Sequence, residues 1–398
     1  MRPKILSFTT VFPRPGDESH GLFVRARLLA AAQFADIHVL NPVPVLEYGN
    51  PAHIFTPLRD VPLLRSDGPL TIHHPRWFYP PLFNAANPFW LNLFTRGPAR
   101  RLHASFPFQL IDAHWGHPEG GAALRLARSL GLPFTITLRG SEIDHARHPA
   151  RRRALARAFQ NAARIIAVSQ PLASLATSLG ASPARVHVIP NGLDSTTFHP
   201  RPRDDARARL GMDPGAVHLL SAGHLTELKG HHRLVEALAL LHTQGMPAHL
   251  WIAGGPGRPA DFTPVLNRTI QDSGLAPFVH LLGVLPPDAL ASAMSAADLF
   301  CLASSREGWP NVVNEALACG APVVATRVGA VPEILSAPGV GVIVENRRPA
   351  VLAAGIRQAL SRSWDRDAIA RHGQSRDWAQ TARDLTALWL ESIQEAAR

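Results

Sequence analysis

Short apolar runs rich in β-branched residues alternate along this 398-residue chain with longer stretches of Ala, Leu and Arg that have helical periodicity. Helices that connect neighbouring parallel strands produce this alternation, so it predicts an α/β fold with doubly wound sheets. In the first half, strands are expected at 4–9, 35–40, 110–113, 134–138, 164–168 and 186–189. Helices are expected at 23–32, 121–130, 150–161 and 171–179.

The alternation is interrupted once and then begins again. Asn191-Gly192 is a turn signal, and the prolines and clustered charges that follow predict a linker at 195–215. Beyond it, strands are expected at 218–222, 249–253, 279–282, 299–303, 322–326 and 341–344, with helices at 231–241, 288–294, 311–319 and 349–360. We therefore expect two Rossmann-like domains, at 1–194 and 216–375. The tail from 368 to 397 predicts an amphipathic helix that docks on an apolar surface.

The charge of the chain is unevenly distributed. The sequence has 40 basic and 30 acidic residues, and all of the resulting net charge of +10 lies in residues 1–194. Only Lys4 and Lys229 are lysines; the other basic residues are arginines. Such asymmetry indicates that one half meets an anionic surface or substrate. With 46% hydrophobic and 18% charged residues, disordered, collagen-like and disulfide-stapled chains are excluded.

Few other features of the sequence indicate the class of protein. Cys301 and Cys319 lie in apolar runs without metal-binding spacing, which indicates buried thiols. The N-terminal segment lacks the pattern of a signal peptide, and no apolar run has the length of a membrane span. The expected location is cytoplasmic, with peripheral membrane binding left open.

The loops after strands are where ligands bind in doubly wound sheets. Neither a dinucleotide fingerprint nor an ATPase-type phosphate loop is present. Instead, residues 221–230 read SAGHLTELKG, in which a strand ends in glycine and Lys229 stands just before a helix. A cation beside the free N–H groups of a helix start suits a phosphate. A solvated loop lysine is an equally good interpretation of Lys229 alone.

A second polar segment, SSREGWPNVVNEALACG at 304–320, also follows a strand and opens a helix. Backbone N–H groups between Gly308 and Val312 suit a phosphate there. A carboxylate accepts paired hydrogen bonds, so Glu315 suits a ribose diol and Glu307 suits sugar hydroxyls. Glu315 as an ordinary helix-surface residue and Glu307 as a partner of the helix dipole are the alternatives, and spacing alone does not decide between them.

Several of these segments together resemble the retaining glycosyltransferases of family 4. Glu307 to Glu315 resembles the E-x7-E motif of that family, and Gly223 to Lys229 resembles its G-R-x4-K loop. Further similar segments are IPNGLDSTTFHP at 189–200, TRVGAVPEI at 326–334, AHWGHPEGG at 113–121 and TLRGSE at 137–142; the last two are similar to members that build bacterial surface polysaccharides. The resemblance covers nearly the whole chain, in order.

The resemblance implies the GT-B fold, with two Rossmann-like domains that face each other across a cleft. The first domain binds the acceptor and is completed by the C-terminal helix 376–398, and the second binds a nucleotide-diphosphate-sugar donor. It further implies catalytic roles for His114, Lys229 and Glu307. Donor-binding positions are Gly21, Gly223, His224, Lys229, Gly283, Arg306, Glu307, Gly308, Asn311, Val312 and Glu315. No metal or other cofactor is implied.

One residue departs from the family pattern. His224 stands where the phosphate loop of the family has arginine. Because imidazole has an ordinary pKa of about 6.5, His224 is only partly charged at neutral pH. Arg306 or Arg139 is the expected substitute, and Arg139 is also a candidate for contact with the acceptor.

The acceptor side is suggested by a segment rich in aromatic residues. Seven aromatic residues lie between Trp77 and Phe94, followed by Arg96, Arg100 and Arg101, and a second Arg run lies between 147 and 157. Adjacent aromatic and basic groups suit an anionic membrane surface and a polyprenyl-linked or glycan acceptor. A helical core segment with a solvated basic face is the alternative.

Two other functions remain to be weighed. A sugar-nucleotide epimerase or hydrolase on the same fold would share the donor site and consume donor without an acceptor. A nucleic-acid binder is suggested by the basic composition, but the neutral second half and the absence of a known binding motif argue against it. The favoured function is transfer of a sugar to a hydroxyl group in bacterial polysaccharide or glycolipid synthesis.

Overall fold

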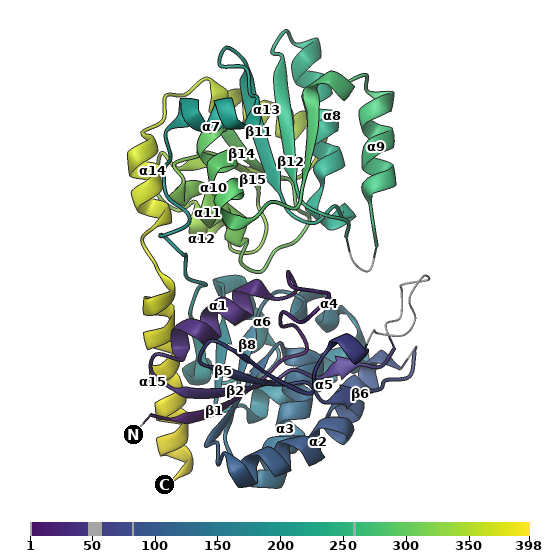
Figure 1. Cartoon of the computed structure of the whole chain (residues 1–398), viewed down its shortest axis with the longest axis vertical. Helices are drawn as coiled ribbons and strands as arrows, with labels where there is room; N and C mark the ends of the chain where they lie inside the picture. Colours follow the sequence, from purple (N-terminus) through teal and green to yellow (C-terminus); the bar gives the residue numbers. More distant parts are fainter. Residues whose placement is uncertain (1, 47–57, 82, 258–259) are drawn as a thin grey trace. The chain divides into compact units, whose positions relative to one another are not determined.

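The computed structural model describes residues 2–46, 58–81, 83–257 and 260–398 (Figure 1). The chain divides into two compact units. Unit 1 contains Met1–Gly192 and Trp378–Arg398, and unit 2 contains Leu193–Asp377. Each unit is built on a mainly or wholly parallel sheet covered by helices (Figure 1).

The sheet of unit 1 has eight strands in the order β10-β9-β8-β7-β1-β2-β5-β4. All neighbours are parallel except β4, which runs antiparallel to β5. The strands are β1 (Lys4–Phe8), β2 (Asp36–Leu40), β4 (Leu64–Asp67), β5 (Leu70–His73), β7 (Leu110–His114), β8 (Phe134–Leu138), β9 (Arg164–Ala167) and β10 (Val186–Val188), and β3 (Val43–Pro44) pairs separately with β6 (Arg76–Trp77). The central strands β7, β8 and β9 are buried along their whole length, as expected for apolar runs covered on both faces.

Helices cover both faces of this sheet. They are α1 (Leu22–Ala31), α2 (Asn87–Ser105), α3 (Gly121–Leu130), α4 (Glu142–Arg147), α5 (Pro149–Asn161), α6 (Gln170–Ser178) and α15 (Trp378–Ala396). On one face α2 packs against α3 and α3 against α5, whereas α1 and α15 pack together on the other (Figure 1). Leu385 and Trp389 of α15 are fully buried there beside Ile5 and Leu28.

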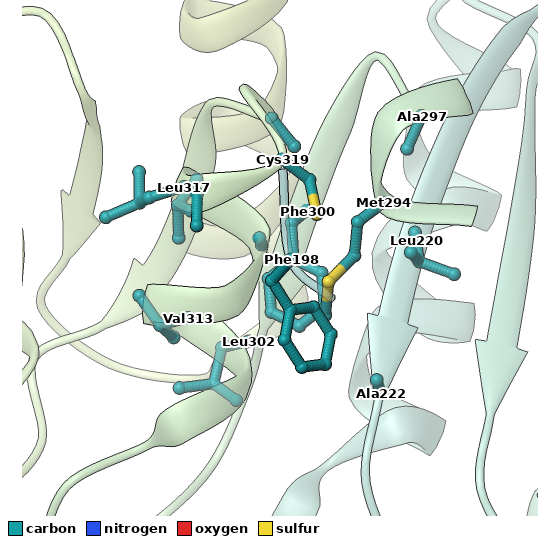
Figure 2. Packing of buried hydrophobic residues seen from close by; sticks show 14 of the residues in the cluster. Phe198, Leu220, Ala222, Met294, Ala297, Phe300, Leu302, Val313, Leu317 and Cys319 are labelled. Atoms are coloured by element: carbon teal, nitrogen blue, oxygen red, sulfur yellow. The ribbon is translucent and has the colours of Figure 1, made fainter. Parts of the chain in front are cut away.

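Unit 2 has six parallel strands in the order β13-β12-β11-β14-β15-β16. They are β11 (Val217–Ala222), β12 (Ala248–Ala253), β13 (Val279–Gly283), β14 (Leu299–Leu302), β15 (Val323–Thr326) and β16 (Gly341–Val344). Its helices are α7 (Arg203–Leu210), α8 (His231–Thr243), α9 (Thr263–Asp272), α10 (Pro287–Ala296), α11 (Asn311–Ala318), α12 (Val331–Ile334), α13 (Pro349–Leu360) and α14 (Arg366–Gly373). Cys301 and Cys319 are buried as predicted, and Figure 2 shows Cys319 with Phe198, Met294 and Phe300 in the core.

The segment 195–215, predicted as a linker, is packed onto unit 2. It contains α7, and Phe198, Ala206 and Met212 lie in the core of unit 2. Arg207 of α7 is buried and pairs with Asp298 at 2.7 Å. Three arginines of this segment, Arg201, Arg203 and Arg207, pair with carboxylates of unit 2, so part of its clustered charge stabilises the packing.

The tail differs from the single helix predicted at 368–397. It forms two helices, α14 and α15, separated by residues 374–377. Ile369 of α14 belongs to the core of unit 2, and Leu385 of α15 belongs to the core of unit 1. Because one tail completes two separate cores, its helix is interrupted.

Some elements were not predicted. They include α4, α9 and the β4–β5 hairpin, and α2 was predicted only as an alternative. The aromatic segment around Trp90 forms the first half of α2, as in the alternative that treated it as helical. Among the helices in the described ranges, none is both long and apolar enough to span a bilayer.

Candidate functional site

The loop that follows β11 forms the first part of the predicted phosphate site. Gly223 has a φ of 146°, and a Cβ atom there would lie 3.3 Å from the Cδ and Cε atoms of Lys229. The stem of Lys229 therefore runs along bare backbone. Gly230 follows with a φ of 70°, and a Cβ atom there would lie 2.2 Å from the carbonyl oxygen of Ala303. The turn into α8 consequently requires glycine.

A third glycine holds the neighbouring loop against the first. A Cβ atom at Gly254, whose φ is 157°, would lie 1.9 Å from the carbonyl oxygen of Gly223. The N–H of Gly254 also donates to the carbonyl of Gly283, at 2.7 Å. The loops after β11, β12 and β13 thus meet backbone to backbone, at the sheet edge where doubly wound folds bind ligands.

Lys229 and Glu307 are brought together. The Nζ atom of Lys229 lies 2.6 Å from Oε1 of Glu307, and the hydroxyl of Ser304 donates to the same oxygen at 2.7 Å. The two charged side chains are 20% and 10% exposed, respectively. A Cβ atom at Gly329 would lie 2.2 Å from the carbonyl oxygen of Glu307, so the loop after β15 presses on this segment. The pair is fixed from both sides and still reaches solvent.

Glu315 lies one turn inside α11, in a half-buried position. Burial raises the pKa of its carboxyl group to about 7. The group therefore changes its charge near neutral pH. Asn311 begins the same helix, and the buried Gly308 before it accepts a hydrogen bond from the N–H of Ala330 at 3.1 Å.

The remaining predicted donor residues lie on the same edge of unit 2. His224 is exposed on the loop after β11, Arg306 is half-buried on the loop after β14, and Val312 is half-buried in α11. The sequence did not single out His231, whose Nε2 lies 3.2 Å from the carbonyl oxygen of Gly223. Burial lowers the pKa of His231 to about 4, so a neutral ring supports the loop that is predicted to bind phosphate. The position of His231 directly after Gly230 was the sequence feature that could have identified it.

In unit 1, His114 ends β7 and is fully buried. Its Nε2 lies 3.2 Å from Oδ2 of Asp112 and 3.1 Å from the hydroxyl of Ser7, and its Nδ1 lies 2.9 Å from Nη2 of Arg139. Burial lowers the pKa of His114 to about 4. Because Arg139 only donates, a neutral ring with its proton on Nε2 accepts from Arg139 at Nδ1 and donates to the hydroxyl of Ser7, with the Asp112 carboxylate close by. The protein thus occupies both ring nitrogens.

Arg139 is held by its neighbours as well. Its guanidinium lies 5.0 Å from the centre of the Phe23 ring and 5.7 Å from that of Trp115, which is the geometry of cation–π contacts. Burial lowers its pKa, and the nearby Arg27 lowers it further. The sequence analysis did not identify Asp112 as a partner of His114. A carboxylate inside the apolar run of β7 was the feature that could have indicated one.

Gly21 stands at the end of the loop between β1 and α1. It has a φ of 80°, and a Cβ atom there would lie 2.7 Å from the carbonyl oxygen of Val11 in the same loop. The loop is therefore folded back on itself at a position that only glycine fits.

The predicted residues form two groups, one in each unit. Within the described ranges, no cluster of His, Cys, Asp and Glu has the form of a metal site.

Two family models match the chain. Glycosyl transferases group 1 matches residues 202–376, and glycosyltransferase family 4 matches residues 47–197. D-inositol 3-phosphate glycosyltransferase 1 of Catenulispora acidiphila is 32% identical over 348 residues, covering 82% of this chain and 82% of that protein. This chain belongs to glycosyltransferase family 4.

Other relatives of this family 4 glycosyltransferase match more locally. D-inositol 3-phosphate glycosyltransferase of Jonesia denitrificans is 33% identical over 243 residues, which cover 58% of this chain and 57% of that protein. The chain thus matches little more than half the length of that relative.

Solved structures share the fold of this glycosyltransferase. Sucrose-phosphate synthase from Thermosynechococcus elongatus has a TM-score of 0.80 at 20% identity, covering 98% of this chain and 100% of that one. Anabaena HepE, in a structure with UDP, has a TM-score of 0.73 at 20% identity with the same coverage. The prediction of two Rossmann-like domains of the GT-B type is confirmed.

Proposed function

We propose that this glycosyltransferase moves a sugar from a nucleotide-diphosphate sugar to a hydroxyl group of a glycan or lipid-linked acceptor, with retention of configuration. The observation that carries the proposal is the Lys229–Glu307 pair at the glycine-lined edge of unit 2, 2.6 Å apart. It puts a cation, which we assign to the diphosphate, beside a carboxylate, which we assign to the sugar. The HepE structures hold UDP, UDP with glucose, or UDP-glucose, which supports the same class of donor here.

The residues of unit 2 would share the donor between them. Lys229 and the backbone of Gly308 to Val312 hold the diphosphate, Glu307 accepts from the sugar hydroxyls, and Glu315 accepts from the ribose. We assign the backbone at Gly283 to the base and Gly21 to the phosphates. Because His224 replaces the arginine of the family pattern, we assign the missing charge to Arg306 or Arg139.

The chemistry would be electrostatic. The acceptor hydroxyl attacks on the face that the nucleotide leaves, and the leaving phosphate takes its proton. Lys229 stabilises the charge that develops on the phosphate. A neutral His114 with both ring nitrogens occupied is unsuited to accept a proton, so its role is to orient Arg139 at the edge of unit 1.

A panel of nucleotide sugars tests the proposal. We expect one donor to release its nucleoside diphosphate only when a lipid-linked or glycan acceptor is present, and the product to keep the anomeric configuration of the donor by NMR. Donor consumption without acceptor would indicate the epimerase or hydrolase alternative. An inverted product would contradict retention.

We also propose an anionic membrane as the partner of unit 1, which would put the enzyme at the inner face of the cell membrane. The helices α2, α3 and α5 carry nine arginines and no carboxylate. Eight of those arginines are exposed, and so are Phe83, Phe89 and Phe94. On the opposite face of the sheet, helix α15 by itself carries three carboxylates. Each basic group near an anionic leaflet contributes about 1 kcal/mol.

Vesicle sedimentation tests this partner. Replacing Arg96, Arg100, Arg152 and Arg153 by serine is expected to weaken binding to anionic vesicles by about two to three orders of magnitude. The matched control replaces four exposed arginines of unit 2, Arg209, Arg268, Arg362 and Arg371, and keeps the binding. Equal binding to neutral and anionic vesicles would exclude the membrane proposal.

A further inference from the structure

Two buried carboxyl groups connect three loops at the carboxyl edge of the unit 1 sheet. The loops follow β1, β7 and β8, which are neighbours in the sheet. Glu119, after β7, accepts hydrogen bonds from the hydroxyl and, at 3.1 Å, the N–H of Thr10, which follows β1. Glu142, after β8, accepts at 3.0 Å from the N–H of Gly116, which follows β7. Each loop is thus bonded to the next through a side chain.

The two carboxyl groups are used differently. Glu142 also accepts from the N–H groups of Arg139 and Gly140, at 3.2 and 2.8 Å, so both of its oxygens are engaged. Glu119 is 1% exposed and uses only Oε1; its Oε2 has no hydrogen-bond partner among the residues that the structure describes. A buried polar atom without a partner is costly. The local fold alone does not account for the choice of a glutamate here.

Glu119 is able to keep its two hydrogen bonds without a charge. Burial, with a smaller contribution from the nearby Glu142, raises its pKa to about 7. With a proton on Oε2, Oε1 remains a carbonyl oxygen that accepts both bonds from Thr10. A glutamine side chain offers the same acceptor.

Those bonds fix a loop that the proposed reaction uses. Val11 follows Thr10, and its carbonyl oxygen is the atom against which Gly21 is packed. Holding Thr10 therefore holds Val11, and Val11 limits where Gly21 lies. Gly21 is the residue of unit 1 assigned to the donor phosphates.

We propose that Glu119 is a positioning residue for the transfer reaction, whose hydrogen bonds with Thr10 hold the Gly21 loop against the loop after β7. The effect on activity rests on the proposed function; the effect on the loop does not. Hydrogen exchange without substrate therefore tests whether the Glu119–Thr10 hydrogen bonds hold the loop. Kinetics with the donor and acceptor found in the panel tests the role of these bonds in the transfer reaction.

The exchange experiment compares four variants. Glu119→Ala removes the acceptor and is expected to speed exchange in residues 10–22 by about tenfold or more, because local opening becomes easier. Thr10→Val removes only the hydroxyl and is expected to act in the same direction, which keeps the test available if the alanine variant does not fold. Glu119→Gln and Thr10→Ser keep the hydrogen bonds and are the matched controls with near wild-type exchange.

The kinetic experiment uses the same variants. For Glu119→Ala we expect kcat to fall about 10- to 100-fold, the scale of a small misplacement at a reacting centre. The KM for the donor changes little because most donor contacts lie in unit 2. Glu119→Gln is expected to restore kcat to within about threefold of the wild type, since the hydrogen-bond geometry is retained.

Three results would overturn the proposal. If residues 10–22 of Glu119→Ala exchange at the wild-type rate, the Glu119–Thr10 hydrogen bonds do not hold the loop. Faster exchange with unchanged kcat would remove the positioning role. A glutamine variant as impaired as the alanine variant would mean that a charge, and not the hydrogen bonds, is required. A wild-type protein that transfers no sugar would instead refute the proposed function, whatever the exchange data.

Discussion

Lys229 is neutralised by Glu307 in this structure, and Ser304 supports the same carboxylate oxygen. A diphosphate that reaches this edge therefore meets an ammonium already fixed in place, with 20% of its side chain exposed. Fixing the cation in advance lowers the ordering cost of binding and of reaction.

Lys229→Ala is expected to remove a charge-assisted contact of roughly 1.5–3 kcal/mol, which lowers kcat/KM by about 10- to 150-fold. Steady-state kinetics with the preferred donor measures it. The sequence offers a matched control, because Lys4 is the only other lysine and lies in the first position of β1. Lys4→Ala should leave kcat/KM unchanged, and an unchanged value for Lys229→Ala would contradict the phosphate assignment.

Glu315 is expected to give the proposed donor site a pH dependence. Its pKa is raised to about 7 by burial, and in the proposed site a ribose diol donates to the ionised form. Below pH 7 the donor must displace a proton, so its KM is expected to fall about tenfold per unit as pH rises from 5 to 7 and to level off above. A nucleotide sugar is the suitable probe, because its esterified diphosphate does not titrate in this range. Glu315→Gln should flatten the profile; a wild-type profile already flat would exclude this role.

At the scale of elements, α15 is the part of the chain that completes unit 1. Trp389 is fully buried among residues of α1 and the central strands, and Arg164 pairs with Glu395 near the end of the helix. The helix is thus fixed both by its apolar stripe and by an ion pair.

Trp389→Ala is expected to destabilise unit 1 by about 3–5 kcal/mol through loss of burial and the cavity left behind. The neighbouring Leu390 is 38% exposed, so Leu390→Ala is a control with an effect within about 0.5 kcal/mol. Urea unfolding followed by tryptophan fluorescence measures both. Equal stability of the two variants would show that α15 is not part of the core.

At the scale of the whole molecule, the two units differ in how the chain builds them. Unit 2 is one continuous segment, Leu193–Asp377, whereas unit 1 needs Met1–Gly192 together with Trp378–Arg398. Only unit 2 therefore contains every residue of its own core in one stretch of sequence.

We expect the fragment 193–377 to fold alone, because its sheet and cores are complete. The fragment 1–192 is expected to lack a cooperative thermal transition, because Leu385 and Trp389 are missing from its core. Adding a peptide of residues 378–398 should restore the transition. Circular dichroism on heating checks each case, and a cooperative transition of 1–192 alone would refute the dependence on α15.

The sequence by itself determined the alternation of strands and helices, the two Rossmann-like domains, and the loops at which glycines and charged residues gather. These follow from local periodicity and turn residues, which act over a few positions. It left α2 as one of two alternatives, because the aromatic and basic residues there lack a clear helical stripe, and it did not reveal the break between α14 and α15.

Only the tertiary structure decided which side chains meet. Lys229 and Glu307 are 78 residues apart, and Glu119 and Thr10 are 109 apart, so no local pattern pairs them. The structure also buried His114 between Asp112 and Arg139, although the family resemblance implies a catalytic role for it. Parallel sheets bring the ends of distant strands to one edge, and burial there sets partners and pKa values. That is why residue types were visible in the sequence, whereas their contacts and charge states were not.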